Sequence, residues 1–201
     1  MAHRVLVIGA TGRTGRLVVS EALAAGHSVT AFARDPAKAA NLGSGVGVTL
    51  GDVKNAASVE AAVMGHDTVI LTLAPNIGGP AARAAIAGMK RAGGQRIIAL
   101  SAHGVGDSRR GIYGWVMNVP MARLARDKDD MESAMAESGL DWTSARPVGL
   151  SNKPKTGRLR VTTPDVALGF GRIARADLAA WMVGAIDDAS TFGKALSLSQ
   201  A

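Results

Sequence analysis

The stretch Val5-Leu6-Val7-Ile8-Gly9-Ala10-Thr11-Gly12-Arg13-Thr14-Gly15 decides the fold. Its apolar start predicts a buried first strand over residues 4–8. The residues that follow place apolar side chains on one face of a helix, which we expect over about 12–25 and which Gly26 closes. The sequence therefore opens with a strand, a glycine-rich turn and a helix.

The three glycines of this turn each have a physical reason. Gly9 lets the chain turn sharply off the strand, and Gly15 lets the helix pack tightly on the sheet. Gly12 has no side chain, so the backbone can approach a diphosphate there, where the helix N-terminus offers N–H groups and partial positive charge. The position of the motif, directly between a strand and a helix, predicts a dinucleotide-binding turn.

Strand-like and helix-like segments alternate along the rest of the chain. Further strands are predicted over 28–33, 46–50, 68–73, 96–100, 141–145, 158–162 and 195–198, and further helices start at Asp35-Pro36 and cover about 56–64, 80–92, 121–138 and 176–186. This pattern predicts an α/β fold, a Rossmann-type doubly wound parallel sheet with helices on both faces. We expect a single domain over residues 1–201, with a small C-terminal substrate-side region that is irregular from about 147 to 175.

The composition narrows the class of protein. The chain is 47% hydrophobic and 19% charged over 201 residues, which is typical of a globular domain. It has no cysteine, so disulfides, thiolate nucleophiles and cysteine metal sites are excluded, and no metal site is predicted. The first apolar run is cut short by Gly9, and the later run 69–75 is too short to span a bilayer. We expect a soluble, cytoplasmic protein.

The net charge of +7 is unevenly distributed. Seven basic residues against Asp165 alone fall between 146 and 175: Arg146, Lys153, Lys155, Arg158, Arg160, Arg172 and Arg175. They form either a solvated basic face or a surface that attracts phosphate-bearing ligands. Because the chain has no nucleic-acid motif or interleaved aromatic stripe, we expect no nucleic-acid partner.

The end of the second strand indicates which dinucleotide is preferred. An enzyme that uses NAD usually has Asp or Glu there, to bond the ribose 2′-hydroxyl. This sequence has Ala33 followed by Arg34, whose guanidinium suits a 2′-phosphate, and Arg13 can add a second contact. Asp35 is interpreted as a helix cap, although its carboxylate could serve NAD. NADP(H) is therefore the preferred cofactor and NAD(H) the alternative.

The series of motifs along the chain resembles the atypical short-chain dehydrogenases/reductases, in particular the NmrA-like proteins and the flavin reductase (biliverdin-IXβ reductase)-like enzymes. It consists of Gly9–Gly15, Val29-Thr30 through Arg34-Asp35, Gly51-Asp52-Val53, Ser101-Ala102, Glu137-Ser138-Gly139-Leu140 and Arg146-Pro147.

The resemblance implies a set of site residues. Those that would wrap the cofactor phosphates are Gly9, Thr11, Gly12, Arg13 and Thr14, beside the packing glycine Gly15. Asp52 and Val53 would contact the adenine, although Asp52 could be a plain helix cap. Leu73, Ala74 and Pro75 would line the cofactor near the nicotinamide ribose. Ser101 and Ala102 would lie near the reacting ring, with Pro147 and Val148 opposite.

The sequence departs from the ordinary family pattern at the catalytic pair. The only tyrosine, Tyr113, is followed four residues later by Met117, so the expected Tyr-x-x-x-Lys pair is missing. Ser101 could bond the nicotinamide or the acceptor, or simply the nearby backbone. His103 is the natural proton donor by location, or a solvated loop histidine.

The loop 103–120 is a candidate lid. It carries Tyr113 and Trp115, which could equally form a contact patch on a partner subunit, together with Arg109 and Arg110, which could meet an anionic acceptor.

The sequence leaves three functions open. The first is an NADPH-dependent oxidoreductase that transfers hydride to a small-molecule acceptor, a flavin, quinone or similar conjugated compound. The second is an NmrA-like redox sensor that binds NADP(H) without turnover. The third and weakest is a protein like the sugar-nucleotide epimerases or dehydratases. We expect no membrane association, and a monomer or a small homo-oligomer.

Overall fold

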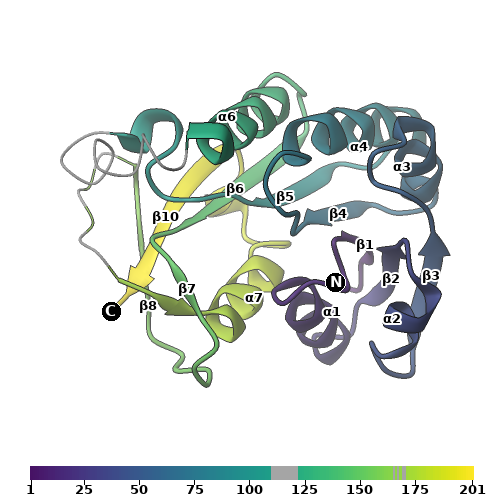
Figure 1. Cartoon of the computed structure of the whole chain (residues 1–201), viewed down its shortest axis with the longest axis horizontal. Coiled ribbons are helices and arrows are strands. Elements are labelled where there is room, and N and C mark those ends of the chain that lie inside the picture. The colour runs from purple at the N-terminus through teal and green to yellow at the C-terminus, as the bar shows by residue number, and fades with distance from the viewer. Residues whose placement is uncertain (110–121, 165, 167, 169–170) are drawn as a thin grey trace.

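The computed structural model describes residues 1–109, 122–164, 166, 168 and 171–201. An eight-stranded sheet runs through the molecule in the order β3-β2-β1-β4-β5-β6-β10-β8, as Figure 1 shows. Its strands are β1 (Arg4–Ile8), β2 (Ser28–Ala33), β3 (Val46–Leu50), β4 (Thr68–Leu71), β5 (Arg96–Leu100), β6 (Asp141–Pro147), β8 (Leu159–Thr162) and β10 (Lys194–Gln200). Neighbours are parallel except β8, which runs antiparallel to β10.

Helices cover both faces of the sheet (Figure 1). They are α1 (Gly15–Ala24), α2 (Pro36–Ala40), α3 (Ala56–Val63), α4 (Gly78–Ala92), α6 (Ala122–Ala136) and α7 (Arg175–Gly184), with short 3₁₀ turns η1 (Gly106–Arg109) and η2 (Ala189–Thr191). A separate parallel pair, β7 (Leu150–Ser151) and β9 (Ile173–Ala174), lies within the region 147–175.

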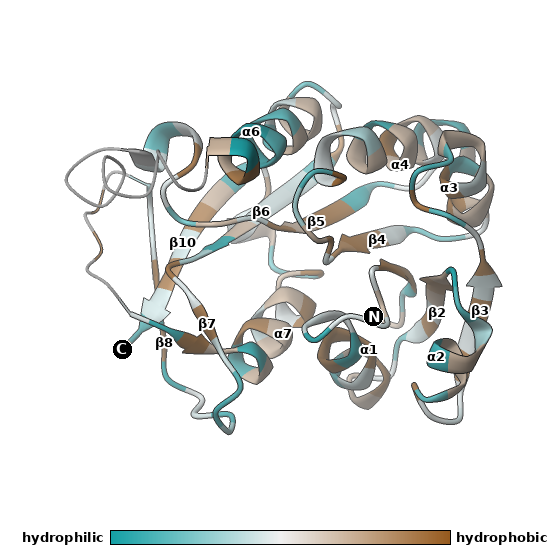
Figure 2. Ribbon diagram, in the orientation of Figure 1, coloured by the Kyte–Doolittle hydropathy of each residue, from teal (hydrophilic) through white to brown (hydrophobic). Residues whose placement is uncertain are grey.

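The alternation of side chains along β1 divides the core into two layers. Val5 and Val7 pack with α1 and α7 on one face, and Leu6 and Ile8 pack with α3, α4 and α6 on the other. All four side chains are fully buried. Figure 2 shows the corresponding hydrophobic colouring of the central strands, with hydrophilic residues on the outer turns of α6. The apolar run in the sequence is thus a strand covered on both sides.

The strand order confirms the predicted Rossmann-type fold. The first six strands follow the order 3-2-1-4-5-6 of doubly wound dinucleotide-binding sheets. The chain reverses direction across the sheet between β1 and β4, and an open α/β sheet binds its ligands outside the carboxyl ends of the strands at such a point. Gly9 follows β1 and Thr72 follows β4 at this edge.

The structure corrects some boundaries. The first helix begins at Gly15 rather than near residue 12, because residues 9–14 form the turn, in which the Gly12 N–H donates to the Gly9 carbonyl at 3.0 Å. The fourth strand ends at Leu71 rather than at residue 73. The region 147–175 contains β7, β8 and β9, of which only β8 was predicted, because two-residue strands leave no periodic pattern.

Arg96 stabilises the edge of the sheet formed by the amino-terminal ends of its strands, opposite the edge where Gly9 and Thr72 lie. Its guanidinium donates to the Thr143 hydroxyl at 2.8 Å and to the carbonyl of Ala185 at 2.5 Å, and lies 4.3 Å from the ring centre of Phe192. Burial lowers the pKa of Arg96 to about 10. This cation is a structural element far from the carboxyl edge. Among the described residues, no helix has both the length and the apolar character that a membrane crossing needs.

Candidate functional site

Steric contacts within the protein require glycine at two positions of the turn. Gly9 has a φ of +90°, and a Cβ built on it would lie 2.7 Å from the Thr72 carbonyl oxygen. The Thr72 hydroxyl donates to the Gly9 carbonyl at 3.2 Å, which holds the turn against the end of β4. A Cβ on Gly15 would lie 2.1 Å from the Gly9 carbonyl oxygen. Both positions therefore admit only glycine for steric reasons.

Gly12 is different, because the protein does not fill the space beside it. A Cβ there would approach one atom, the Gly9 carbonyl oxygen, at 3.1 Å. Its missing side chain opens onto a cavity of about 400 Å³. The N-cap residue of α1, Thr14, makes no side-chain cap hydrogen bond, so the start of the helix is open to an anion. The open space at Gly12 and the uncapped start of α1 therefore allow a diphosphate to approach the backbone closely.

This cavity, the glycine-turn pocket, collects residues from the ends of β1, β2, β3 and β4. Its lining is Gly9, Thr11, Gly12, Phe32, Ala33, Arg34, Gly51, Val53, Lys54, Thr72, Leu73, Ala74 and Ile77. Arg34 and Lys54 are its two cations, and no carboxylate among the described residues lines it. Lys54 was not predicted, since it lies one residue beyond the motif that carries Val53.

The carboxylate of Asp35 is engaged elsewhere. It caps α2, as predicted, by accepting hydrogen bonds from the N–H groups of Ala37 at 2.9 Å and Lys38 at 3.2 Å. Its second oxygen lies 3.7 Å from the Lys38 ammonium. Within the described part of the chain, Asp35 therefore forms no ion pair with Arg34, and it does not line the glycine-turn pocket.

Four of the residues predicted near the phosphates and the adenine do not line the glycine-turn pocket. Arg13, Thr14 and Gly15 lie at the turn and the start of α1, beside the lining residue Gly12. Asp52 accepts the Lys54 N–H at 3.0 Å within the turn after β3. The alternative interpretation of Asp52 as a helix cap is wrong, because Asn55 caps α3 through the Ser58 N–H.

A second cavity of about 360 Å³, the β5-edge pocket, lies beside the first and shares Leu73 with it. Its lining is Leu73, Pro75, Leu100, Ser101, Ala102, His103, Gly104, Val105, Leu124, Ala125, Lys128, Pro147, Val148, Gly149, Leu150 and Arg175. The structure thus brings together the predicted residues after β4, β5 and β6. Their common position at the carboxyl edge explains why segments distant in sequence meet here.

Ser101 and His103 are both buried in this pocket, with 5% and 7% of their surface exposed. The Ser101 hydroxyl has no hydrogen-bond partner among the described residues, so it can bond a ligand. His103 Nδ1 lies 2.9 Å from the Ser197 hydroxyl. Burial lowers the pKa of His103, and the nearby positive charge of Arg146 lowers it further. His103 is therefore a neutral wall residue and not a solvated loop histidine.

Lys128 is a site residue that the sequence analysis missed. Its ammonium donates to the Leu100 carbonyl at 2.8 Å, and only 3% of the residue is exposed. Burial lowers the pKa of Lys128, and the carboxylates of Asp127 and Glu132 partly oppose this. Leu124 lies one helical turn earlier and lines the same pocket. Leu124 and Lys128 therefore have the spacing of a Tyr-x-x-x-Lys pair on α6, with leucine at the position of the tyrosine. The pair was missed because the search for it started from the only tyrosine, Tyr113.

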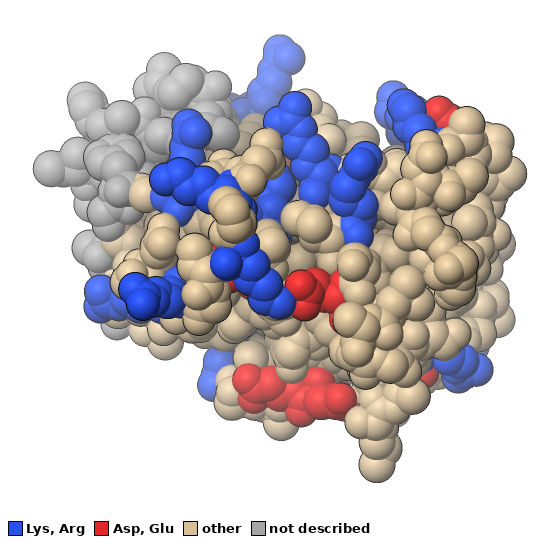
Figure 3. Space-filling model, turned by 90° about the horizontal axis from the view of Figure 1, so that it is seen from below, with Lys and Arg blue, Asp and Glu red and all other residues tan. Residues whose placement is uncertain are grey.

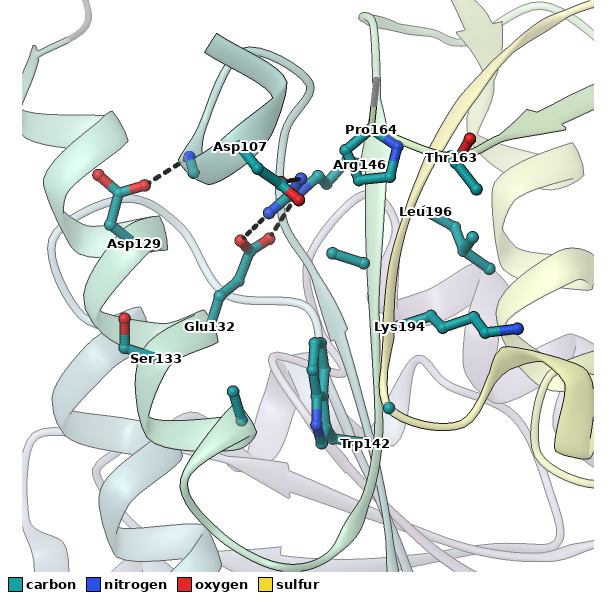
Figure 4. A pocket seen from close by; sticks show the side chains of 14 residues that line it. Asp107, Asp129, Glu132, Ser133, Trp142, Arg146, Thr163, Pro164, Lys194 and Leu196 are labelled. Carbon is teal, nitrogen blue, oxygen red and sulfur yellow. Dashed lines mark hydrogen bonds and ion pairs between the residues drawn. The ribbon is translucent and has the colours of Figure 1, made fainter. Parts of the chain in front are cut away.

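A third cavity, of about 580 Å³, lies between α6 and β10 and is shown in Figure 4. Its buried cation, Arg146, bonds Glu132 through Nε at 3.0 Å and through Nη2 at 2.6 Å, and also pairs with Asp107. Burial works against the charge of Arg146, but these carboxylates outweigh it and raise its pKa. Because the buried cation of this cavity is already paired with Glu132 and Asp107, we place the functional site in the other two pockets.

The predicted lid residues Tyr113 and Trp115 lie outside the described residues, as do Arg110 and Met117. Arg109 belongs to η1.

A family model described as NAD(P)H-binding matches residues 9–189, which include both pockets. The chain belongs to this NAD(P)H-binding family. The match covers the glycine turn, β2 to β6 and α7. The predicted family is therefore confirmed, and the oxidoreductase type of function is supported.

Individual relatives match over nearly the whole chain. The isoflavone reductase homolog IRL of Zea mays is 32% identical over 216 residues, covering 96% of this chain and 67% of that protein. The uncharacterized sugar epimerase YhfK of Bacillus subtilis (strain 168) is 29% identical over 215 residues, covering 98% and 94%. The structure of ChuY, an anaerobillin reductase from Escherichia coli O157:H7, superposes with a TM-score of 0.85 at 27% identity, covering 98% and 97%.

The two pockets fit the NAD(P)H of this family. The glycine-turn pocket has room and positive charge for an adenosine with its phosphates, and Gly12 leaves the turn open for them. The β5-edge pocket continues from Leu73 toward Ser101, with walls that are mainly apolar. Residues of the first pocket would hold the nucleotide, and residues of the second would face the reacting end.

Proposed function

We propose that the protein is an NADPH-dependent reductase of a flat conjugated acceptor, such as a flavin or a quinone. The observation that carries this proposal is the junction of the two pockets at Leu73. A ligand that fills the glycine-turn pocket can extend along the carboxyl edge into the β5-edge pocket, where an acceptor has room beside it. Proximity of donor and acceptor is the main requirement of hydride transfer.

The preference for NADPH rests on charge. Arg34 and Lys54 line the glycine-turn pocket, while the carboxylate of Asp35 caps α2. A 2′-phosphate gains charge-assisted hydrogen bonds from such cations. The 2′-hydroxyl of NAD is usually bonded by a carboxylate, and none of the described residues that line this pocket carries one.

The chain supplies electrostatics and shape for the reaction. When bound, NADPH supplies a hydride, which reduces the acceptor and leaves NADP⁺. Negative charge then develops on the acceptor, and the buried ammonium of Lys128 stabilises it in a pocket of low dielectric. The Ser101 hydroxyl donates a hydrogen bond to the acceptor or the cofactor. The acceptor takes its proton from solvent, because the neutral imidazole of His103 has no readily released proton near pH 7.

The test is a cofactor titration followed by an acceptor screen. We expect the protein to bind NADPH more tightly than NADH and to oxidise NADPH steadily with FMN, riboflavin or small quinones. Binding of NADPH without turnover across this panel would refute the proposed reductase activity.

A second candidate is a redox sensor, and Leu124 is the observation that favours it. Leucine at the tyrosine position removes a proton-shuttling group, as suits a protein that binds the dinucleotide without chemistry. This candidate predicts unequal affinities for NADP⁺ and NADPH together with no turnover. The same leucine argues against an epimerase or dehydratase, which needs a base at this position.

A further inference from the structure

We infer that the β5-edge pocket selects acceptors that carry an anionic group, such as a phosphate, sulfonate or carboxylate, and that Arg175 binds this group. The inference rests on the proposed function for the identity of the pocket, and it adds the charge of the substrate. Three observations carry it: the balance of charge in the pocket, the partners of Arg175, and the position of Arg175 beside the glycine turn.

The pocket has an apolar body and two cations. Leu100, Leu124 and Val148 form part of its walls. Among the described residues that line it, Lys128 and Arg175 are the only ones with a positive charge, and none is a carboxylate. The carboxylates of Asp127 and Glu132 already act on Lys128, whereas a neutral conjugated molecule would bring no counter-charge to Arg175. An acceptor with an apolar ring system and one anionic group matches both parts of the lining.

Among the described residues, the only hydrogen-bond partner of the Arg175 side chain is neutral. Arg175 is half-buried, and its guanidinium donates to the Asn152 side-chain oxygen at 2.7 Å. Within the described part of the chain it forms no ion pair, and the same is true of Arg13. Burial lowers the pKa of Arg175, and the positive charge of Arg13 lowers it further. Two guanidinium groups therefore repel each other here until an anion binds.

The nearby carboxylates of Asp177 and Glu21 already have hydrogen-bond or ion-pair partners. Asp177 accepts the N–H of Gly157 at 2.7 Å and the hydroxyl of Thr156 at 2.8 Å, which fixes the loop before β8. Glu21 on α1 pairs with Lys155 at 2.8 Å. Figure 3 shows the result on one face, where lysine and arginine side chains gather over the side that carries α7, β7 and β8 and acidic side chains form smaller patches.

The position of Arg175 suits a group at the mouth of the pocket. It is the first residue of α7, whose N-cap residue Ala174 has no side chain to cap the helix. The helix N-terminus adds partial positive charge at the same place, which the carboxylate of Asp177 in the first turn partly offsets. Ser101, whose buried hydroxyl lacks a partner among the described residues, lines the same pocket. An acceptor can thus be bound by Arg175 at its anionic group while its ring system contacts the apolar walls.

The experiment compares acceptors that differ only in charge. FMN and riboflavin share a ring system, as do naphthoquinone sulfonate and naphthoquinone. Their affinities are measured by flavin fluorescence and by calorimetry, with saturating NADP⁺ present so that no reaction occurs. We expect the anionic member of each pair to bind about tenfold more tightly, as one charge-assisted contact implies.

The variants identify the residue. Arg175→Gln should abolish the preference for the anionic probe and leave NADP⁺ affinity unchanged, and Arg175→Lys should retain part of the preference. Arg160→Gln is the matched control, because it removes one positive charge from exposed β8, outside the pocket. Thermal melting verifies that each variant folds. If Arg175→Gln does not fold, Arg175→Lys is used to test the inference.

Three results would overturn the inference. They are equal affinity of the wild-type protein for both members of each pair, failure of both anionic probes to bind, and a preference that survives in Arg175→Gln. If that variant instead loses NADP⁺ affinity with the preference intact, the guanidinium serves the cofactor. An anionic preference without NADPH oxidation would refute the proposed function alone, and oxidation with no preference would refute this inference alone.

Discussion

The ammonium of Lys128 on α6 donates a hydrogen bond of 2.8 Å to the carbonyl of Leu100, the last residue of β5. This contact holds a buried cation at the carboxyl edge of the sheet, next to Ser101. An ammonium in such a place is costly to desolvate, so its presence indicates a role for the charge.

Lys128→Met should lower the turnover of acceptor by about a hundredfold, because it removes a preorganised positive charge from the pocket. NADPH affinity should stay nearly unchanged, and the free energy of unfolding should fall by about 1–3 kcal/mol, because the Leu100 carbonyl is left unpaired and the buried carboxylates of Asp127 and Glu132 lose a nearby cation. Steady-state kinetics and calorimetry measure these effects. Lys90→Met, an exposed change on α4, is the control, and full turnover in Lys128→Met would contradict the assigned role.

Gly12 and Gly15 should respond in opposite ways to substitution. Gly15→Ala should destabilise the fold by about 1–3 kcal/mol, because its Cβ would clash with the Gly9 carbonyl. Gly12→Val should keep the melting temperature close to that of the wild type and lose dinucleotide binding. Thermal melting and NADPH titration separate the two effects. Tight NADPH binding by a folded Gly12→Val protein would show that the diphosphate does not approach this turn.

Arg34→Glu should reverse the cofactor preference. Loss of one charge-assisted contact should reduce the ratio of NADPH to NADH affinity by about ten- to a hundredfold. Lys54→Gln should change the ratio in the same direction by less, because it removes a charge without adding an opposite one. Titration of each variant with both dinucleotides gives the ratio, and Arg158→Glu, outside both pockets, is the control. An unchanged ratio in Arg34→Glu would place the 2′-phosphate elsewhere.

His103 should contribute to the pH dependence of stability. Its pKa is lowered in the folded protein from 6.5, so below that pH the unfolded chain binds a proton that the folded chain resists. The free energy of unfolding should therefore fall as the pH drops through this region, and His103→Asn should show a shallower fall. Urea unfolding on either side of pH 6.5 measures it. His27, whose pKa is lowered by burial and by His3, adds an effect of the same sign that the variant retains.

Arg96→Met should destabilise the fold by about 2–4 kcal/mol without affecting cofactor affinity, because it leaves several buried acceptors unpaired. Arg96→Lys should recover only part of this loss, since an ammonium cannot reproduce the planar set of donors. Chemical unfolding with NADPH titration tests both statements. A wild-type unfolding midpoint in Arg96→Met would contradict the structural role.

The parts of the site that were predictable from sequence have short-range signals. The glycine turn and Arg34 fall within the first two strands, where the motif and the strand end can be recognised without knowledge of the packing. Alternation of strands and helices likewise predicted the sheet, because apolar periodicity directly reflects which faces are buried.

The features of the site that could not be predicted depend on tertiary contacts. Arg175 reaches the pocket because α7 packs against α1, and the burial of His103 involves Ser197, which lies 94 residues later. No local sequence pattern encodes these long-range contacts. Lys128 was an exception, since its spacing from Leu124 on a single helix was visible in the sequence once leucine was allowed at the tyrosine position.

The division of the site at Leu73 has an evolutionary consequence. The glycine-turn pocket is lined by described residues between 9 and 77, and the β5-edge pocket by described residues between 73 and 175. Mutations in the later part of the gene can therefore change what is recognised while the earlier part stays under constant selection. A lineage with this layout can acquire new acceptor specificities while its dinucleotide-binding pocket stays the same.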